Sequence, residues 1–167
     1  MKSNLVLIGM PGVGKSTAGV VAAKLAGHQF LDTDLVIMER DGRLLRDIIE
    51  QNGVEGFLAI ENRVNASIDA SRTVIATGGS VVFGHDAMAH LADIGTIVYL
   101  RASYETVAGR VTDLNGRGVS MKPGQTLRDI YEERKVLYEK FADRIIDVDG
   151  QSVEATAREL AEIALAD

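Results

Sequence analysis

The sequence predicts an α/β fold in three layers, with helices covering both faces of a five-stranded parallel sheet. Two observations predict it. Short runs rich in β-branched residues recur along the chain without clean alternation, as expected of parallel strands that are buried on both faces. Helical stretches separate these runs, and strands that alternate with helices favour a doubly wound sheet.

Four runs predict strands, and a shorter pair, Phe30-Leu31, predicts a fifth. The four are Leu5 to Ile8, Thr73 to Ala76, Thr96 to Leu100 and Ile145 to Val148. The last helix is predicted behind Ser152 as its N-cap, because apolar residues follow it at helical spacing. In such sheets ligands bind at the carboxyl ends of the strands, so the residues just after each run are candidate site residues.

The composition of the chain limits how many domains it can form and which kinds of partner it can bind. A chain of 167 residues with 46% apolar residues can bury one core, so we expect one domain over residues 1–167, working as a monomer. The net charge of -6 comes without a basic block, which argues against a nucleic-acid partner. No cysteine is present, and the first apolar run breaks at Gly9 and Pro11. We therefore expect a cytoplasmic protein with no membrane partner.

A glycine-rich segment, Gly9 to Ser16, directly follows the first predicted strand and is called the phosphate loop below. It matches G-x-x-x-x-G-K-[ST] in the strand-to-helix context that this motif requires. Glycines allow backbone N–H groups to converge on phosphate oxygens at a helix N-terminus. The motif predicts a site for ATP with Mg²⁺, formed by Gly12, Val13, Gly14, Lys15, Ser16 and Thr17. Lys15 would bridge the β- and γ-phosphates, and the Ser16 hydroxyl would bind Mg²⁺.

Asp32-Thr33-Asp34 follows the second predicted strand, where alternation would place both carboxylates on one side. Phosphoryl transfer to an alcohol needs a metal for the phosphates and a carboxylate for the hydroxyl proton. We assign Asp32 to the Mg²⁺ shell and Asp34 to the hydroxyl of a small-molecule acceptor. The alternative is that either aspartate only caps the next helix.

One further segment and one arginine are candidates for binding the acceptor molecule. Thr77-Gly78-Gly79-Ser80 closes the third predicted strand, and glycines there allow a ligand to approach the backbone, although a plain tight turn has the same pattern. Arg134 falls on the apolar stripe of a predicted helix, and an inward-facing arginine favours an anion. A structural ion pair is the alternative for Arg134.

A segment rich in loop-forming residues, 113–124, follows the predicted helix that carries Arg110. It predicts a mobile lid, because phosphoryl transfer loses ATP to water unless the site closes over the acceptor. Arg117 is the candidate catalytic arginine that closure brings to the transferring group. The alternative is an exposed loop whose charges are incidental.

Together these residues resemble the shikimate kinase family from about residue 4 to 150. The resemblance rests on residues along the whole of this range: the phosphate loop, Phe30-Leu31-Asp32-Thr33-Asp34, Arg40-Asp41-Gly42, Phe57 with Glu61, Thr77-Gly78-Gly79, Arg117 and Arg134 to Tyr138. It implies a sheet of the nucleoside-monophosphate-kinase type, with an acceptor-binding helical region at about 33–62. It also implies that Asp34 and Arg134 bind the hydroxyl and carboxylate of shikimate, and that Arg110 and Arg117 lie near ATP.

Three departures from the family pattern fall on the acceptor side. The family's Phe-Arg pair is Phe57-Leu58 here, its Gly-Glu pair upstream is Gly53-Val54, and its third loop glycine is Ser80. The family's arginine helps to hold the shikimate carboxylate, and its loss at Leu58 is expected to cost about tenfold to a hundredfold in affinity.

Three functions stay open on the sequence. The first is ATP-dependent phosphorylation of shikimate, in aromatic amino acid biosynthesis. The second is a kinase of a different small polyol or hydroxy acid, which the departures at Leu58, Val54 and Ser80 favour. The third is a nucleotide-binding regulatory protein with weak catalysis; the presence of both Lys15 and Arg117 argues against it.

Overall fold

Five parallel strands form one sheet in the order β2-β3-β1-β4-β5. The computed structural model describes residues 2–114, 116 and 118–166. The strands are β1 (Asn4–Ile8), β2 (Gln29–Asp32), β3 (Thr73–Ala76), β4 (Gly95–Arg101) and β5 (Arg144–Asp147). Each of the five predicted runs is a strand, with ends shifted by one residue at most.

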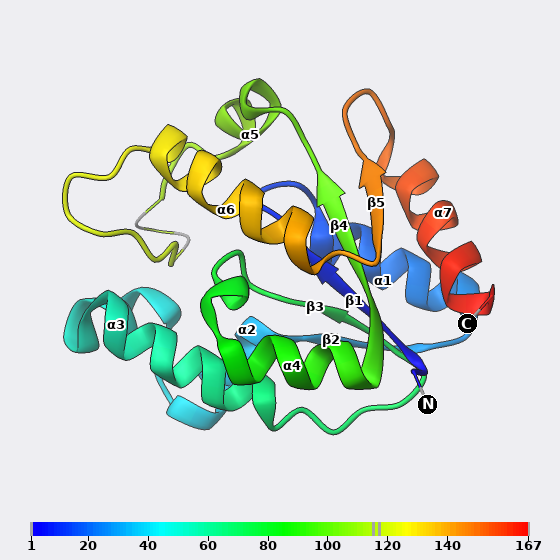
Figure 1. Cartoon of the computed structure of the whole chain (residues 1–167), viewed down its shortest axis with the longest axis horizontal. Coiled ribbons are helices and arrows are strands. Elements are labelled where there is room, and N and C mark those ends of the chain that lie inside the picture. The colour runs from blue at the N-terminus through cyan, green and yellow to red at the C-terminus, as the bar shows by residue number, and fades with distance from the viewer. Residues whose placement is uncertain (1, 115, 117, 167) are drawn as a thin grey trace.

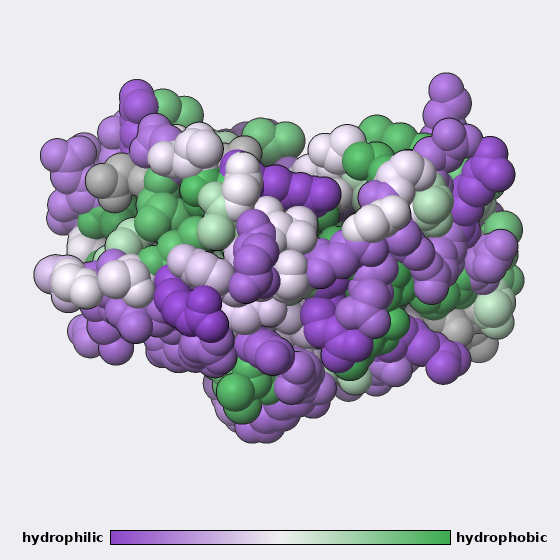
Figure 2. All heavy atoms as spheres, turned by 90° about the horizontal axis from the view of Figure 1, so that it is seen from above, coloured by the Kyte–Doolittle hydropathy of each residue, from purple (hydrophilic) through white to green (hydrophobic). Residues whose placement is uncertain are grey.

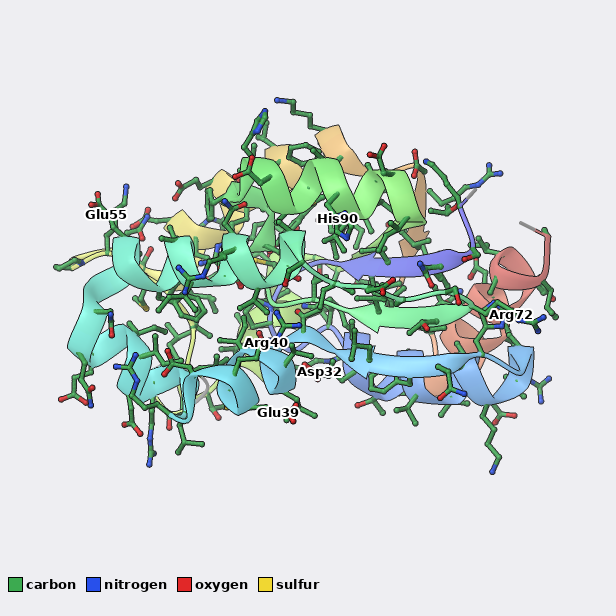
Figure 3. The ribbon with its side chains drawn as sticks, turned by 90° about the horizontal axis from the view of Figure 1, so that it is seen from below. Asp32, Glu39, Arg40, Glu55, Arg72 and His90 are labelled. Atoms are coloured by element: carbon green, nitrogen blue, oxygen red, sulfur yellow. The ribbon has the colours of Figure 1, made fainter. Side chains whose placement is uncertain are left out.

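Helices cover both faces of this sheet. They are α1 (Lys15–Ala26), α2 (Thr33–Asp41), α3 (Leu45–Ala66), α4 (His85–Ile94), α5 (Tyr104–Arg110), α6 (Leu127–Phe141) and α7 (Val153–Ala166), with a 3₁₀ turn, η1 (Val81–Phe83). Helices α1 and α7 pack together on one face, and α4 and α6 lie on the other (Figure 1). Seen edge-on in Figure 3, the sheet lies between α4 and α1. The predicted three-layer α/β fold is confirmed.

The strands whose sequences lack alternation of apolar and polar residues are the buried ones. All five residues of β1 and all four of β3 are buried, whereas β2 and β5, at the two edges, are more accessible. Central parallel strands have helices on both faces, so every side chain enters the core. The Ser152 hydroxyl accepts a hydrogen bond from Ala155 N at the start of α7, which confirms the predicted N-cap.

Helices α2 and α3 lie beside the carboxyl ends of the strands, and α3 also packs against α4 (Figure 1). They share a small core of buried apolar residues: Ile37, Leu45, Ile48, Phe57 and Val64. Helix α3 is broken at Gly53, which has φ 73° and ψ 173°, in a region open to glycine but closed to most other residues. The break sets the direction of the second half of α3, which carries Phe57, Leu58 and Glu61.

The outer surface is mostly polar. Figure 2 shows one face dominated by hydrophilic residues, with smaller groups of apolar residues between them on both halves. Within the described part of the chain, none of the helices combines the length and the apolar character that a membrane span needs.

Candidate active site

The phosphate loop connects β1 to α1 with the backbone geometry that its glycines predict. Gly9, Gly12 and Gly14 have φ values of 149°, 84° and 96°, and Gly14 is the N-cap of α1. A Cβ at Gly9 would lie 2.7 Å from the Leu100 carbonyl oxygen, so a side chain does not fit there. Loop N–H groups and the N-terminus of α1 therefore form a cradle suited to an anion.

Lys15 begins α1 with its ammonium group turned back into this loop. Its side chain is buried, and Nζ donates hydrogen bonds to the carbonyl oxygens of Gly9 at 2.7 Å and Met10 at 2.9 Å. Gly12, Gly14, Ser16 and Thr17 line the same cavity as Lys15, whereas the side chain of Val13 is buried in the core. Val13 can therefore contribute only its backbone.

Asp32 joins the end of β2 to the phosphate loop. Its Oδ2 accepts a hydrogen bond from Ser16 Oγ at 2.8 Å, and its Oδ1 accepts one from Asp34 N at 2.9 Å. Asp32 is thus the N-cap of α2 as well as a neighbour of Ser16, so the capping interpretation holds for this residue. Figure 3 labels Asp32 where β2 meets α2.

Asp34 lies in the first turn of α2, not on an extended strand. Alternation along β2 is therefore the wrong reason for the predicted placement, because the chain turns into a helix directly after Asp32, although both aspartates do line one cavity. Asp34 reaches the cavity from that helix instead. Burial raises the pKa of Asp34 to about 6, the Asp32 carboxylate adds to the rise, and the Lys15 ammonium opposes it.

Glu61 brings a second carboxyl group to the cavity from α3. Its side chain is buried, and its Oε1 accepts a hydrogen bond from Ser80 Oγ at 2.6 Å. Burial raises the pKa of Glu61 to about 8; the Ser80 hydrogen bond opposes this, Asp34 adds to it and Arg134 opposes it. The two carboxyls flank Gly78, where a Cβ would lie 2.7 Å from Asp34 Oδ1 and 3.0 Å from Glu61 Oε2.

Arg134 reaches the cavity from α6 and is 3% exposed. Its Nη2 donates to the Ser120 carbonyl oxygen at 2.6 Å, and its guanidinium carbon lies 5.6 Å from the centre of the Phe83 ring. A Cβ at Gly79 would lie 3.1 Å from Arg134 Nη1. No carboxylate in the described part of the chain forms an ion pair with Arg134, so its guanidinium is a buried cation suited to an acidic ligand.

These groups surround one cavity of about 290 Å³ at the carboxyl ends of the strands. Three short segments of the chain and five single residues line it. The segments supply Pro11, Gly12, Gly14, Lys15, Ser16 and Thr17; Thr77, Gly78, Gly79 and Ser80; and Gly118, Val119 and Ser120, and the single residues are Asp34, Leu45, Phe57, Glu61 and Arg134. Lys15, Asp34 and Arg134 therefore share one cavity, with part of the predicted lid as its wall.

Two other predicted residues lie outside this cavity. Leu58 lines a neighbouring cavity of about 100 Å³ with Val54, Phe83 and Met121, and Arg134 forms the boundary between the two. Arg110, at the end of α5, donates through Nη1 to two carbonyl oxygens of the phosphate loop, those of Gly12 at 3.4 Å and Val13 at 3.5 Å.

Arg117 lies outside the described residues, so its predicted role stays a prediction. Glu61 belongs to the family resemblance, but no role in the site was predicted for it. A signal for it exists in the sequence: Glu61 follows Phe57 by four residues on one helix, so both side chains share a face, and both line the cavity.

Comparison with known proteins places this geometry in a family. The model of the shikimate kinase family matches residues 11–164. The chain belongs to the shikimate kinase family. Among curated relatives, a shikimate kinase of Histophilus somni is 33% identical over 166 residues, covering 97% of this chain and 95% of the relative. A shikimate kinase 2 of Yersinia pseudotuberculosis is 31% identical over 154 residues, covering 88% and 87%.

Solved structures agree with this membership. A shikimate kinase from Acinetobacter baumannii in complex with shikimate superposes with a TM-score of 0.87 at 29% identity, covering 99% of this chain and 94% of that one. A shikimate kinase from Aquifex aeolicus gives a TM-score of 0.80 at 26% identity, covering 98% and 96%. As a member of the shikimate kinase family, the chain is an ATP-dependent kinase with a P-loop kinase fold.

Proposed function

We propose that this protein transfers the γ-phosphoryl group of ATP to a hydroxyl of shikimate. The observation that carries the proposal is that Lys15, Asp34 and Arg134 line one cavity. A phosphate-binding lysine, a carboxylate with a raised pKa and a buried guanidinium are what transfer to the hydroxyl of an acid requires. The family membership and the shikimate complex of the Acinetobacter baumannii relative support the same substrate.

On the nucleotide side, the loop from Gly12 to Thr17 would hold the phosphates through backbone N–H groups. Lys15 is buried at the base of the loop, where its ammonium can bridge the β- and γ-phosphates. Arg110 donates a hydrogen bond to the Gly12 carbonyl oxygen of the loop and would position the nucleotide there. We keep Arg117 as the arginine that approaches the transferring group, on the strength of its place in the lid sequence.

The residues present also fit Mg²⁺. Ser16 Oγ and Asp32 Oδ2 are 2.8 Å apart beside the phosphate loop, and a hydroxyl and a carboxylate are both ligands that Mg²⁺ takes in kinases. Among the described residues, no cluster of three or more acidic, His or Cys side chains could hold a metal ion. Ser16 and Asp32 would therefore hold Mg²⁺ together with phosphate oxygens of ATP. When bound, Mg²⁺ neutralises charge on those phosphates.

On the acceptor side, Asp34 would accept the proton of the attacking hydroxyl. The oxygen–phosphorus bond to the acceptor forms as the bond between the γ-phosphorus and the bridging oxygen breaks, and ADP leaves. A pKa of about 6 leaves Asp34 ionised at neutral pH and still basic enough to take a proton. Arg134 would hold the acceptor carboxylate, while Gly78, Gly79 and Ser80 form the floor beneath it.

Measurement of ADP release tests this proposal. Shikimate at millimolar concentration should stimulate ADP release well above the rate with ATP alone, and Asp34→Asn should abolish the stimulation. A rate with shikimate equal to the ATP-only background contradicts the proposal.

A second candidate is a kinase of another small hydroxy acid or polyol. The observation that favours it is the apolar cavity of about 100 Å³ beside Arg134, lined by Leu58 and Val54 where the family pattern has charged residues. A panel of hydroxy acids and polyols in the same assay would identify such an acceptor. In that case Leu58→Arg, with Leu58→Met as its volume-matched control, should create the shikimate activity that the native chain lacks.

A further inference from the structure

A hydrogen bond joins Ser80, which departs from the family pattern, to Glu61 on α3. Ser80 stands where the family has a third glycine, and its Oγ donates a 2.6 Å hydrogen bond to Glu61 Oε1. Both side chains are buried, with Ser80 5% and Glu61 2% exposed. The bond links α3 to the segment that follows β3, so it fixes the Glu61 carboxyl on the acceptor side of the cavity.

The partner of Glu61 is a neutral hydroxyl, although a buried carboxyl is normally paired with a cation. Leu58 lies three residues before Glu61 on α3, so the two side chains share one face of the helix. The family pattern has an arginine at this position, and that arginine is absent here. No Lys, Arg or His among the described residues forms an ion pair with Glu61.

Several charged or titratable groups face Glu61 from other elements. Asp34 approaches from α2, on the other side of Gly78, and Arg134 and Tyr138 approach from α6. Lys15 lines the same cavity from α1. The charge of Glu61 therefore bears directly on whether the cavity accepts an anion beside Arg134.

We propose that Ser80 is a positioning residue for Glu61: its hydroxyl takes the place of the missing cation, and the pair controls the affinity of the cavity for an acidic acceptor. The pairing stands on the structure of the cavity, whereas the effect on acceptor affinity rests on the proposed function. The two departures are then linked through one carboxyl group. Leu58 removes the cationic partner of Glu61, and Ser80 supplies a neutral one.

The charge state of Glu61 gives the proposal a measurable consequence. Burial raises the pKa of Glu61 to about 8, so the group is mostly protonated at neutral pH and does not repel an acceptor carboxylate. Above that pH the ionised group faces both Asp34 and the acceptor, and affinity for the acceptor should fall. The Ser80 hydrogen bond favours the ionised form, so its removal should raise the pKa of Glu61 further.

Carboxyl ¹³C NMR of protein labelled at glutamate tests the pairing without any acceptor. Ser80→Ala should raise the pKa of Glu61 by about 1 or more, because a hydrogen bond to a charged group is lost. Ser71→Ala, at an exposed serine, is the matched control and should leave that pKa unchanged. Glu61→Gln assigns the resonance. A pKa of Glu61 equal in Ser80→Ala and native protein overturns the proposal.

A double-mutant cycle tests whether a cation can replace the hydroxyl. Ser80→Ala should lower Tm by about 3 to 8 °C in the native background. In the Leu58→Arg background the guanidinium can pair with Glu61, so the same substitution should lower Tm clearly less. Equal effects in the two backgrounds contradict the proposed link. Ser80→Gly, which restores the family residue, serves as a second variant if Ser80→Ala folds poorly.

Shikimate affinity as a function of pH tests the functional consequence. The Kd of native protein should rise as the pH passes about 8, Ser80→Ala should move that rise to higher pH, and Glu61→Gln should remove it. A Kd profile that is the same in all three proteins overturns the role in affinity. Absence of shikimate binding at every pH contradicts the proposed function instead, and the NMR and unfolding results then decide the pairing alone.

Discussion

Ser16 Oγ donates a hydrogen bond to Asp32 Oδ2 across 2.8 Å, which connects the phosphate loop to the end of β2. The same aspartate caps α2 through its other oxygen, and Asp34 follows in the first turn of that helix. Asp32 thus connects Ser16, on the nucleotide side of the cavity, to Asp34, on its acceptor side. A change at Asp32 is therefore expected to act on metal use and on the position of Asp34 together.

The first prediction concerns Asp32→Asn, which keeps an oxygen for the cap but removes the charge. We expect the Mg²⁺ concentration for half-maximal turnover to rise about tenfold or more, because a charged ligand is replaced by a neutral one. Titration of ADP release with Mg²⁺ measures this. Asp47→Asn, on the first turn of α3, is the control. An unchanged Mg²⁺ titration for Asp32→Asn would remove this residue from the proposed metal shell.

The second prediction concerns Asp34→Asn, which keeps the shape of the side chain but cannot accept a proton. We expect kcat to fall by about 10² to 10⁴ while the Kd of ATP stays unchanged, because the group acts on the acceptor hydroxyl. Steady-state kinetics and calorimetry with ATP separate the two quantities. A variant with kcat close to native would show that Asp34 is not the base.

The third prediction concerns Arg134→Lys, which keeps the charge but loses the planar fork of donors. Acceptor KM should rise about tenfold to a hundredfold, with a smaller effect on kcat, since the contact is made before the chemical step. Lys140→Gln, at an exposed position of the same helix, should leave both values unchanged. An acceptor KM unaffected by Arg134→Lys would place the acceptor carboxylate elsewhere.

The fourth prediction concerns stability against pH. The pKa of Glu61 is raised from 4.5 to about 8 in the folded protein, so the folded state holds this proton more tightly than the unfolded state. The stabilisation is complete below pH 4.5 and is lost as pH rises toward 8, by roughly 3 to 5 kcal/mol. Glu61→Gln cannot ionise, so urea unfolding should show a smaller decline for it between pH 5 and 9. If the free energy of unfolding declined equally with pH in native protein and in Glu61→Gln, Glu61 would not be buried in its neutral form.

Much of the fold could be predicted from sequence because its signals are local. The run Thr73 to Ala76 is a strand with the same ends in the structure, and Ser152 caps α7 as predicted. The phosphate loop was predictable because three positive φ values require glycine at Gly9, Gly12 and Gly14. The inward direction of Arg134 followed from helical periodicity alone, and the structure buries it.

The rest depended on contacts between distant segments. Alternation along β2 assigned Asp34 to an extended segment, whereas Asp32 caps α2 and Asp34 lies in the first turn of that helix. Gly78 and Gly79 line the cavity, but which side chains would meet a Cβ there could not be read from the sequence: Asp34 and Glu61 at Gly78, and Arg134 at Gly79. No local pattern pairs Ser80 with Glu61, since the two residues lie 19 positions apart on different elements.

Phosphorus NMR of a reaction with ATP, Mg²⁺ and shikimate would show whether the phosphoryl group reaches shikimate, because it identifies the product and not only the loss of ATP. We expect a new phosphomonoester signal that grows in step with ADP and is absent with Asp34→Asn. Release of inorganic phosphate alone, with no ester of shikimate, would contradict the proposed function.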